Sequence, residues 1–232
     1  MSLNFEPNKN KKLIIKIDNQ QYCRYPIKTH LITDKDDIFL VVSKYILDYS
    51  KQAQFLFISE RVVAITQGRA YPIKDIKPSF LAKFLVKFVY KSPYGIGLGS
   101  PYTMELAIKE AGIGRILLAC FCALITKPFG LRWIFYKVVG KNINAIDGPC
   151  DYTMPPYNKY AKLGPKNPTL VAKKIAQKFK IETVIIDAND LGVNILGKSN
   201  SQGNDKFYQQ LFVDNPLGQT DECTPLCLIA KN

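Results

Sequence analysis

The longest uninterrupted apolar run of the chain, Ile116–Ile125, limits what its segment can become. A membrane-spanning helix needs roughly 20 apolar residues, and this run has about half of that number. Leaving a large apolar side chain in water instead of burying it forfeits roughly 1.5–3 kcal/mol. We therefore predict a substantially buried helix or strand and no membrane anchor. Cys120 and Cys122 lie inside the run, where free thiols behave as small hydrophobes, so we expect neither to form a disulfide.

The other apolar patterns mix strands and helices without a regular order. Segments rich in β-branched and aromatic residues predict strands at Leu13–Ile17, Phe55–Ser59, Arg61–Thr66, Phe135–Val139 and Glu182–Asp187. Capping residues and helical periodicity predict helices at about Ile38–Tyr49 after Thr33-Asp34, from Phe80 after Ser79, from Pro101 to Gly112, and at Thr169–Lys180. Because these elements do not alternate as strand–helix–strand, we expect an α+β (mixed α/β) fold and not a doubly wound sheet.

The domain organisation follows from breaks in these patterns. We expect a basic N-terminal lead and strand over residues 1–23, and one unit over residues 24–232. Pro165 and Pro168 frame the start of the last predicted helix, so a soft boundary is expected near Pro165.

The ionisable residues narrow the classes of partner and site. The 32 basic and 19 acidic residues give a net charge of +13, which favours anionic partners such as nucleotides, polyphosphates, nucleic acid or acidic lipid. A single histidine, His30, excludes a three-histidine zinc site. The six cysteines form no CxxC pair, and Asn4–Lys12 is polar, which predicts a reduced, cytoplasmic protein.

Two glycine patterns resemble phosphate-binding loops. Gly192–Ser199 matches GxxxxGK[ST], but its interior residues favour a strand and a loop follows it, so we interpret the match as chance. Lys198 remains open as a point charge for an anion. Gly95, Gly97 and Gly99 lie between two predicted helices, which favours a turn over a dinucleotide fingerprint.

Three aspartates and two arginines are candidate ligand-binding residues. Asp147 lies in a Gly/Pro turn, Asp187 ends a predicted strand and Asp190 follows it. Carboxylates in such positions suit Mg²⁺ or Mn²⁺, although acids at strand ends also cap turns. Arg61 and Arg69 flank a β-rich segment, where they either hold a phosphate or carboxylate or are solvated turn charges.

In order along the chain, several segments resemble the coenzyme F-420-0:gamma-glutamyl ligase family. They are Tyr25-Pro-Ile-Lys28-Thr, Ile58-Ser-Glu60-Arg61-Val-Val-Ala-Ile-Thr-Gln67-Gly68-Arg69, Ala145-Ile-Asp147 with the Pro/Asn stretch that ends at Asn158, Pro165-Lys-Asn-Pro168, and Val184-Ile-Ile-Asp187. The resemblance extends from about residue 24 to residue 230.

This resemblance implies a gamma-glutamyl ligase-like mixed α/β fold, a homodimer, and amide bond formation through an acyl phosphate. GTP is the expected co-substrate, with ATP as the alternative, and Mg²⁺ or Mn²⁺ balances the phosphate charge. A nucleotide and a small acidic substrate are the expected partners, without a membrane or nucleic acid. The implied metal ligands are Asp147, Asp187 and Asp190, and the implied nucleotide- or phosphate-binding residues are Lys28, Glu60, Arg61, Arg69 and Asn158.

The segment after Asp187 departs from the family, because Ala-Asn-Asp190 stands where members carry arginines. This departure keeps an alternative open, in which the chain is a non-catalytic relative that binds anions or RNA. No catalytic residue is assigned. If the ligase mechanism applies, Asp147 and Asp187 are predicted to converge on a shared ion.

Overall fold

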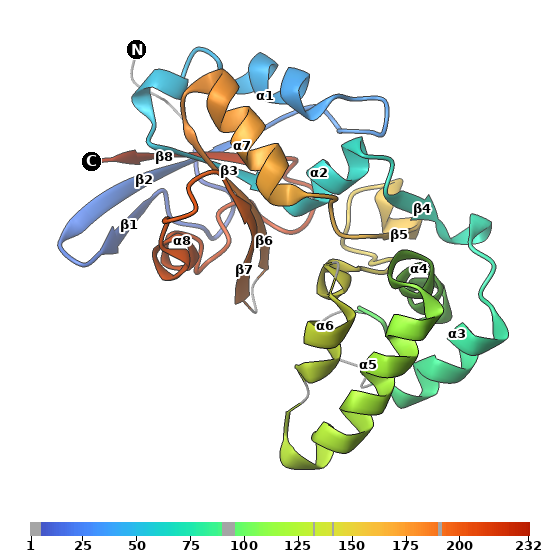
Figure 1. Ribbon diagram of the computed structural model, residues 1–232. Helices are drawn as coiled ribbons and strands as arrows, with labels where there is room; N and C mark the ends of the chain where they lie inside the picture. The colour runs from blue at the N-terminus through green and yellow to red at the C-terminus, as the bar shows by residue number, and fades with distance from the viewer. Residues whose placement is uncertain (1–5, 90–95, 132, 141, 190–191) are drawn as a thin grey trace. The chain divides into compact units, whose positions relative to one another are not determined.

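The computed structural model describes residues 6–89, 96–131, 133–140, 142–189 and 192–232, and Asp190 lies outside these ranges. The chain divides into two units, coloured along the sequence in Figure 1. The first unit contains the residues up to Gly68 and those from Pro165 onward, and the second contains Arg69–Gly164. The polypeptide therefore crosses between the units twice, and the second crossing lies at Pro165.

A mixed sheet forms the centre of the first unit. In the described residues its strands are β1 (Ile14–Ile17), β2 (Gln20–Ile27), β3 (Phe55–Ser59), β6 (Glu182–Asn189), β7 (Gly192–Lys198) and β8 (Leu226–Lys231), in the spatial order β1-β2-β8-β3-β6-β7. Strands β3 and β6 pair in parallel, whereas the other described pairs of this sheet are antiparallel. The predicted α+β class is confirmed, since a doubly wound sheet is mostly parallel.

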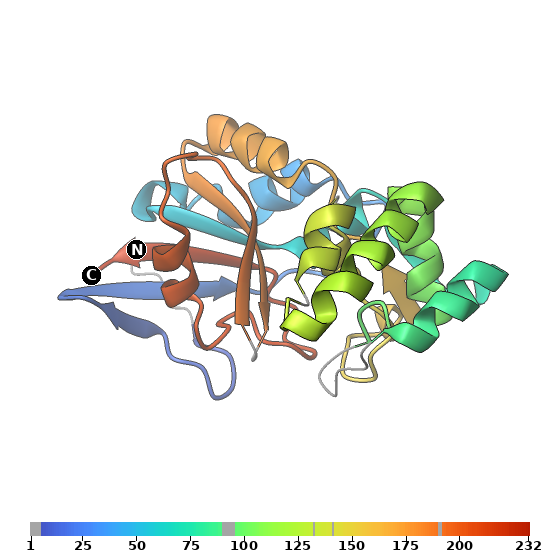
Figure 2. The same cartoon turned by 60° about the horizontal axis from the view of Figure 1, so that its bottom comes forward.

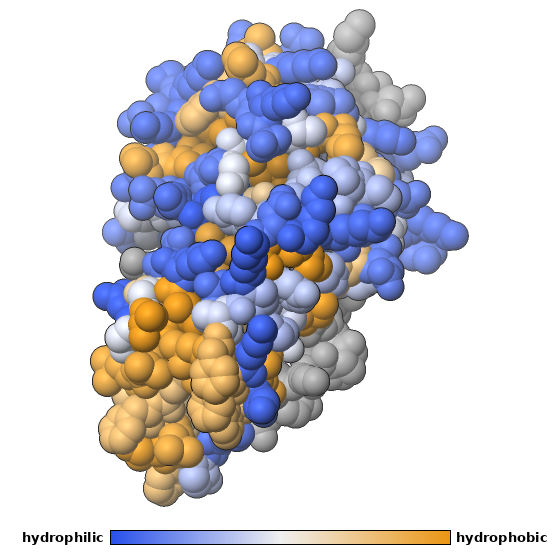
Figure 3. Space-filling model, turned by 90° about the vertical axis from the view of Figure 1, so that its right-hand side faces the viewer, coloured by the Kyte–Doolittle hydropathy of each residue, from blue (hydrophilic) through white to orange (hydrophobic). Residues whose placement is uncertain are grey.

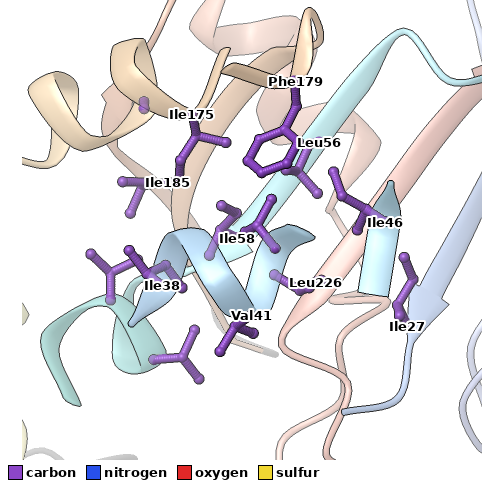
Figure 4. Close-up of a cluster of buried hydrophobic side chains, with 14 of the residues drawn as sticks. Ile27, Ile38, Val41, Ile46, Leu56, Ile58, Ile175, Phe179, Ile185 and Leu226 are labelled. Atoms are coloured by element: carbon purple, nitrogen blue, oxygen red, sulfur yellow. The ribbon is translucent and has the colours of Figure 1, made fainter. Parts of the chain in front are cut away.

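Helices cover both faces of this sheet, as Figures 1 and 2 show. Helices α1 (Ile38–Ile46), α2 (Glu60–Thr66) and α7 (Pro168–Phe179) pack on one face, and α8 (Asp205–Leu211) packs on the other. Alternate residues of β3 point to opposite faces of the sheet. Leu56 and Ile58 pack in the layer of α1, α2 and α7 (the first layer), and Phe57 packs in the layer of α8 (the second layer). This two-residue period explains why a central strand is apolar throughout. Figure 4 shows the first layer, in which Ile58 lies among side chains from α1, α7 and the neighbouring strands.

The second unit is helical, with one small sheet. Its elements are β4 (Ala70–Pro72) paired with β5 (Tyr160–Lys162), and helices α3 (Phe80–Leu85), α4 (Pro101–Ala111), α5 (Ile113–Thr126) and α6 (Ile134–Val139). Ser79 caps α3 as predicted, and Ser100 caps α4; each accepts a backbone N–H of the first turn. Short 3₁₀ helices complete the two units: Ser50–Gln52, Ile73–Asp75, Val86–Phe88, Lys127–Phe129, Ile143–Ala145 and Tyr157–Lys159.

Each unit joins the two crossing segments on its own side. In the first unit the side-chain amide of Gln67 donates to the carbonyl of Lys166 at 3.0 Å and accepts its N–H at 2.7 Å. In the second unit the Arg69 carbonyl accepts the N–H of Leu163 at 3.0 Å. The Nε of the Arg69 side chain donates to the carbonyl of Gly164 at 2.6 Å. The crossings at residues 68–69 and 164–165 are therefore neighbouring segments, although 95 residues separate Arg69 from Gly164.

Two predicted strands are helices in the structure. Residues 61–66, predicted as a strand from Val62, Val63 and Ile65, belong to α2, and residues 135–139 belong to α6. In α2 these β-branched side chains are buried, so packing outweighs the small intrinsic helix penalty of such residues. The helix at residue 38 begins after Asp37 and not after the predicted Thr33-Asp34 cap, because the Asp37 carboxylate accepts the N–H groups of Phe39 and Leu40.

The predicted burial of Ile116–Ile125 is wrong. The run is helical as part of α5, but only Ile116 and Ala119 are buried, while Leu117, Leu118, Phe121, Leu124 and Ile125 are exposed. One side of α5 packs into the second unit, and the remainder of its apolar surface faces outward. Cys120 and Cys122 are free thiols, as predicted. In the part of the chain that the structure describes, no helix combines the length and apolarity needed to cross a bilayer.

A buried cation connects strand β2 to the segment after α8. Arg24 of β2 is only 1% exposed, and its guanidinium donates to the Asp214 carboxylate, to the Leu211 carbonyl at 3.0 Å and to the Lys12 carbonyl. Burial acts to raise the pKa of Asp214, but hydrogen bonds and charge from Arg24 outweigh it and hold that pKa below its usual value.

Replacing Asp214 with Asn is expected to lower the free energy of unfolding by roughly 2–4 kcal/mol at neutral pH, because it leaves Arg24 buried without its counter-charge. Urea denaturation followed by circular dichroism measures the change. Since the folded pKa is depressed, the stabilisation is complete above the ordinary carboxyl pKa of about 3.9 and disappears as the pH falls through the lowered value. The difference between wild type and Asp214→Asn should therefore shrink in acid.

The matched control is Asp205→Asn, which removes an exposed ion pair with Lys198. Exposed pairs contribute about 0–1 kcal/mol, so this variant should unfold almost like the wild type. Equal losses in the two variants would contradict a special role for the Arg24 pair.

Candidate functional site

The parallel pairing of β3 and β6 brings two predicted site residues to one edge of the sheet. Ser59 is the register partner of Ile186, so Glu60 and Asp187 each come one residue later. Neighbouring strands lie about 4.8 Å apart, and parallel strands leave their carboxyl ends on the same edge. The backbone at Glu60 and at Asp187 therefore lies side by side, although the two residues are far apart in sequence.

Local sequence explains why Glu60 is held in place. Helix α2 begins directly after β3 without a connecting loop, so Glu60 occupies its first position. Its side chain is only 4% exposed, whereas Arg61 and Asp187 are half-buried. A buried carboxylate is costly unless a cation or hydrogen-bond donors accompany it, which makes Glu60 the residue at this edge with the strongest electrostatic requirement.

Strands β2 and β8 add a lysine to the same edge. Ile27 and Ile58 are both register partners of Leu226, so the end of β2, the start of β8 and the end of β3 lie together. Lys28 follows Ile27 directly and is exposed. Because β8 separates β2 from β3, the backbone of Lys28 lies about 10 Å from that of Glu60. The topology thus gathers Lys28, Glu60, Arg61 and Asp187, four of the predicted site residues, into what we call the carboxyl-edge cluster.

A histidine network that sequence analysis did not assign follows Lys28. Tyr45 Oη accepts the backbone N–H of His30 at 2.9 Å and lies 2.8 Å from its Nδ1, while Nε2 lies 2.9 Å from Asp36 Oδ1. Since the tyrosine oxygen already accepts one hydrogen bond, its own proton suits Nδ1, and the Nε2 proton then points to Asp36. The backbone N–H of Thr33, followed by His30, lowers the pKa of Asp36. Residues 30, 36 and 45 do not follow a regular spacing that a sequence pattern would reveal. They meet only because the loop before α1 folds back onto that helix.

The remaining predicted residues lie in the second unit. The Asp147 backbone exchanges hydrogen bonds with Lys162 at 3.0 and 2.9 Å, and its Oδ1 accepts the N–H of Gly148 at 3.0 Å. This last contact is the turn-capping role that an acid in a Gly/Pro segment can have. The predicted convergence of Asp147 with Asp187 joins residues of different units and stays a prediction.

Arg69 and Asn158 complete the predicted set. The guanidinium of Arg69 is buried, donates to Gly164 and pairs with Glu110 Oε1 at 3.0 Å. Asn158 is half-buried in the short helix Tyr157–Lys159. Lys162, which sequence analysis did not single out, is also buried, and its Nζ donates to the Ala145 carbonyl at 2.9 Å.

A divalent cation would find carboxylate oxygens at the carboxyl-edge cluster. The described residues contain no group of three or more His, Cys, Asp or Glu side chains arranged to hold a metal ion. Mg²⁺ usually retains waters and takes one or two protein carboxylates together with substrate phosphates. Glu60 and Asp187 suit that mode of binding, in which phosphate and water complete the coordination.

No protein-family model matches this chain, and no curated protein matches its sequence.

The GxxxxGK[ST] segment is a strand, as the residue preferences predict. Residues 192–198 form β7, and a turn separates that strand from α8. Lys198 Nζ donates to the Gly203 carbonyl at 2.7 Å and pairs with Asp205 at 2.7 Å. These contacts give the lysine a structural role. In the other glycine pattern, Gly97 and Gly99 lie in and beside a turn before α4, and Gly95 lies outside the described residues.

Close packing requires a glycine at position 197. A substitution there tests whether the GxxxxGK[ST] segment has a structural role and not a phosphate-binding one. A Cβ at this position would lie 2.4 Å from the backbone carbon of Pro168 and 2.5 Å from the nitrogen of Thr169, at the start of α7. Gly197→Ala should therefore lower the free energy of unfolding by roughly 1–3 kcal/mol, measured by chemical denaturation.

Gly192→Ala is the matched control, because no atom lies within 4 Å of a Cβ built at that end of the same strand. It should change stability by less than about 1 kcal/mol. If Gly197→Ala were as stable as the control and instead weakened phosphate binding, the structural interpretation of this glycine would be wrong.

Proposed function

We propose that the chain is a nucleotide- and divalent-metal-dependent ligase that forms an amide bond between a small acid and a glutamate-like amine. The observation that carries the proposal is the register of β3 against β6, which brings Glu60 and Asp187 to one sheet edge with Lys28 and Arg61. In parallel α/β sheets, ligands characteristically bind outside the carboxyl ends of the strands, and β3 and β6 form the parallel pair described in this sheet. The cluster combines acids for a hard cation with bases for phosphate, which is the combination that phosphoryl transfer requires.

The chemistry has two steps. A carboxylate oxygen of the acid attacks the γ-phosphorus of GTP, and the bond from that phosphorus to the bridging oxygen breaks, which yields an acyl phosphate and GDP. The amine nitrogen then attacks the acyl carbon, the carbon–oxygen bond to phosphate breaks, and the nitrogen loses a proton to water as the amide forms. ATP would serve the same chemistry.

The protein's own residues position and neutralise the reactants. Lys28 is exposed and supplies a mobile positive charge to phosphate oxygens, whereas Arg61 is held at the start of α2 and presents a planar donor group. Glu60 and Asp187 would hold Mg²⁺ or Mn²⁺, which when bound withdraws negative charge from the phosphates. Both reactants are anionic, so the positive charges of Lys28 and Arg61, with a cation held by the two acids, would offset their mutual repulsion.

Isothermal titration with GTP in the presence of Mn²⁺ tests the proposal. Glu60→Gln and Asp187→Asn preserve side-chain shape but remove a ligand charge, so each should weaken Mn²⁺-dependent GTP binding at least tenfold, which corresponds to about 1.4 kcal/mol. Lys28→Ala should weaken nucleotide binding both with and without the metal, because it acts on phosphate directly.

Asp205→Asn is again the control, since β7 runs antiparallel to β6 and places this acid beyond the opposite edge of the sheet. It should bind GTP like the wild type. Absence of GTP and ATP binding by the wild-type protein, or unchanged binding in Glu60→Gln combined with Asp187→Asn, would rule out the proposal. Metal-independent binding without turnover would instead identify a non-catalytic anion-binding relative.

A further inference from the structure

The second unit exposes a large apolar surface on the hairpin of α5 and α6. Large side chains that are each at least 40% exposed form what we call the hairpin patch: Leu117, Leu118, Phe121, Leu124, Ile125, Phe129, Leu131, Trp133 and Tyr136. Helix α3 adds Phe80, Phe84 and Phe88, which are also exposed. Figure 3 shows hydrophobic residues gathered on the surface of the second unit.

An exposed apolar surface of this kind is expected to contact a binding partner. Contiguous apolar patches on monomeric soluble proteins rarely exceed several hundred Å², and larger ones mark protein or membrane contacts. A helix that is apolar around most of its circumference, as α5 is, is normally covered. Only Ile116 and Ala119 of α5 are buried in the unit, so its exposed side chains are available for another contact.

The charges around the hairpin patch have one sign. Between Glu110 and Asp147 the sequence contains five basic residues and no acid. Of these five basic residues, Arg115, Lys127 and Lys137 lie in the ranges that the structure describes, and all three are exposed. The same holds around α3, where the stretch from Asp75 to Glu105 has four lysines and no acid between its ends. The second unit carries 14 of the 32 basic residues but only 5 of the 19 acids, so +9 of the total +13 belongs to it.

This combination points to one kind of partner. We propose that the hairpin patch inserts into the surface of an anionic lipid bilayer, with the α5–α6 hairpin lying in the interface. This proposal replaces the expectation, implied by the family resemblance, that no membrane is a partner. Apolar side chains enter the boundary between headgroups and acyl chains, and the surrounding bases contact anionic headgroups. A two-fold contact with a second copy would place each basic patch against an identical one without any acid, so like charges would oppose that packing.

The geometry of the hairpin suits the interface and not a crossing. Helix α5 has 14 residues and is about 21 Å long, which is shorter than the roughly 30 Å hydrocarbon core. Trp133 and Tyr136 are both exposed near the start of α6, and such amphipathic rings prefer the depth of the headgroups. Lys137 Nζ lies 5.2 Å from the Trp133 ring centre, which combines an aromatic ring and a cation at this depth.

Vesicle binding tests the proposal, and Trp133 reports on it because it is the chain's single tryptophan. The full chain is mixed with vesicles of phosphatidylglycerol and phosphatidylcholine in equal parts, and in parallel with pure phosphatidylcholine vesicles. We expect co-sedimentation with the mixed vesicles, weaker binding to the neutral ones, and a blue shift of Trp133 emission with quenching by brominated lipid. High salt should weaken the binding.

Variants separate the apolar and charged contributions. Phe121→Ser combined with Leu124→Ser should weaken vesicle binding at least tenfold, because both side chains are more than 60% exposed and contribute little to the folded unit itself. Lys127→Glu combined with Lys137→Glu should weaken binding to anionic vesicles about tenfold or more while leaving the neutral-vesicle signal largely unchanged.

The matched control is Leu40→Ser combined with Leu47→Ser in the first unit, because these two leucines are exposed but lie outside the hairpin patch. It should bind vesicles like the wild type. Absence of both co-sedimentation and the Trp133 shift would overturn the proposal. So would a dimer in sedimentation equilibrium that the Phe121 and Leu124 substitutions dissociate, because a second copy would then occupy the patch. These outcomes are independent of GTP binding.

Discussion

The parallel pairing of β3 with β6 is the contact on which the arrangement of the first unit depends. It joins a segment near residue 57 to one near residue 184 and, together with the pairing of β8 with β2 and β3, brings the two sequence segments of that unit into one sheet. The helices of one layer pack against Leu56, Ile58 and Ile185 from these two strands, and those of the other layer against Phe57. A shift of one residue in this register would turn the side chains of one strand toward the opposite layers and disrupt the packing of both.

The same register creates the carboxyl-edge cluster. Glu60 and Asp187 are neighbours because each follows a paired strand residue, and Lys28 joins them through the pairing of β2 with β8. The strand pairing that stabilises the first unit therefore also positions the residues of the proposed chemistry. The sheet must form before any of these charges meet, and the buried Glu60 carboxylate then requires a cation or hydrogen-bond donors.

The second unit shows where hydrophobicity and burial separate. The apolar run at residues 116–125 is predicted from the sequence to be a buried helix or strand, yet five of its ten residues are exposed and only Ile116 and Ala119 are buried. Hydropathy reports how strongly a segment avoids water, and it does not report which partner covers it. A bilayer surface satisfies the same preference as a protein core, and the uniformly basic surroundings favour that partner.

Local features were determined by the sequence itself. The strands at residues 14–17 and 55–59, the capped helices after Ser79 and Ser100, the strand nature of residues 192–198 and the α+β class all follow from periodicity, caps and turn residues. Only tertiary structure decided that Val62, Val63 and Ile65 form a helix, that Gly197 is needed for contact with α7, and that His30 meets Asp36 and Tyr45. The division has a physical reason: propensities act over a few residues, whereas register, close packing and long-range contacts depend on segments that meet only when the chain folds.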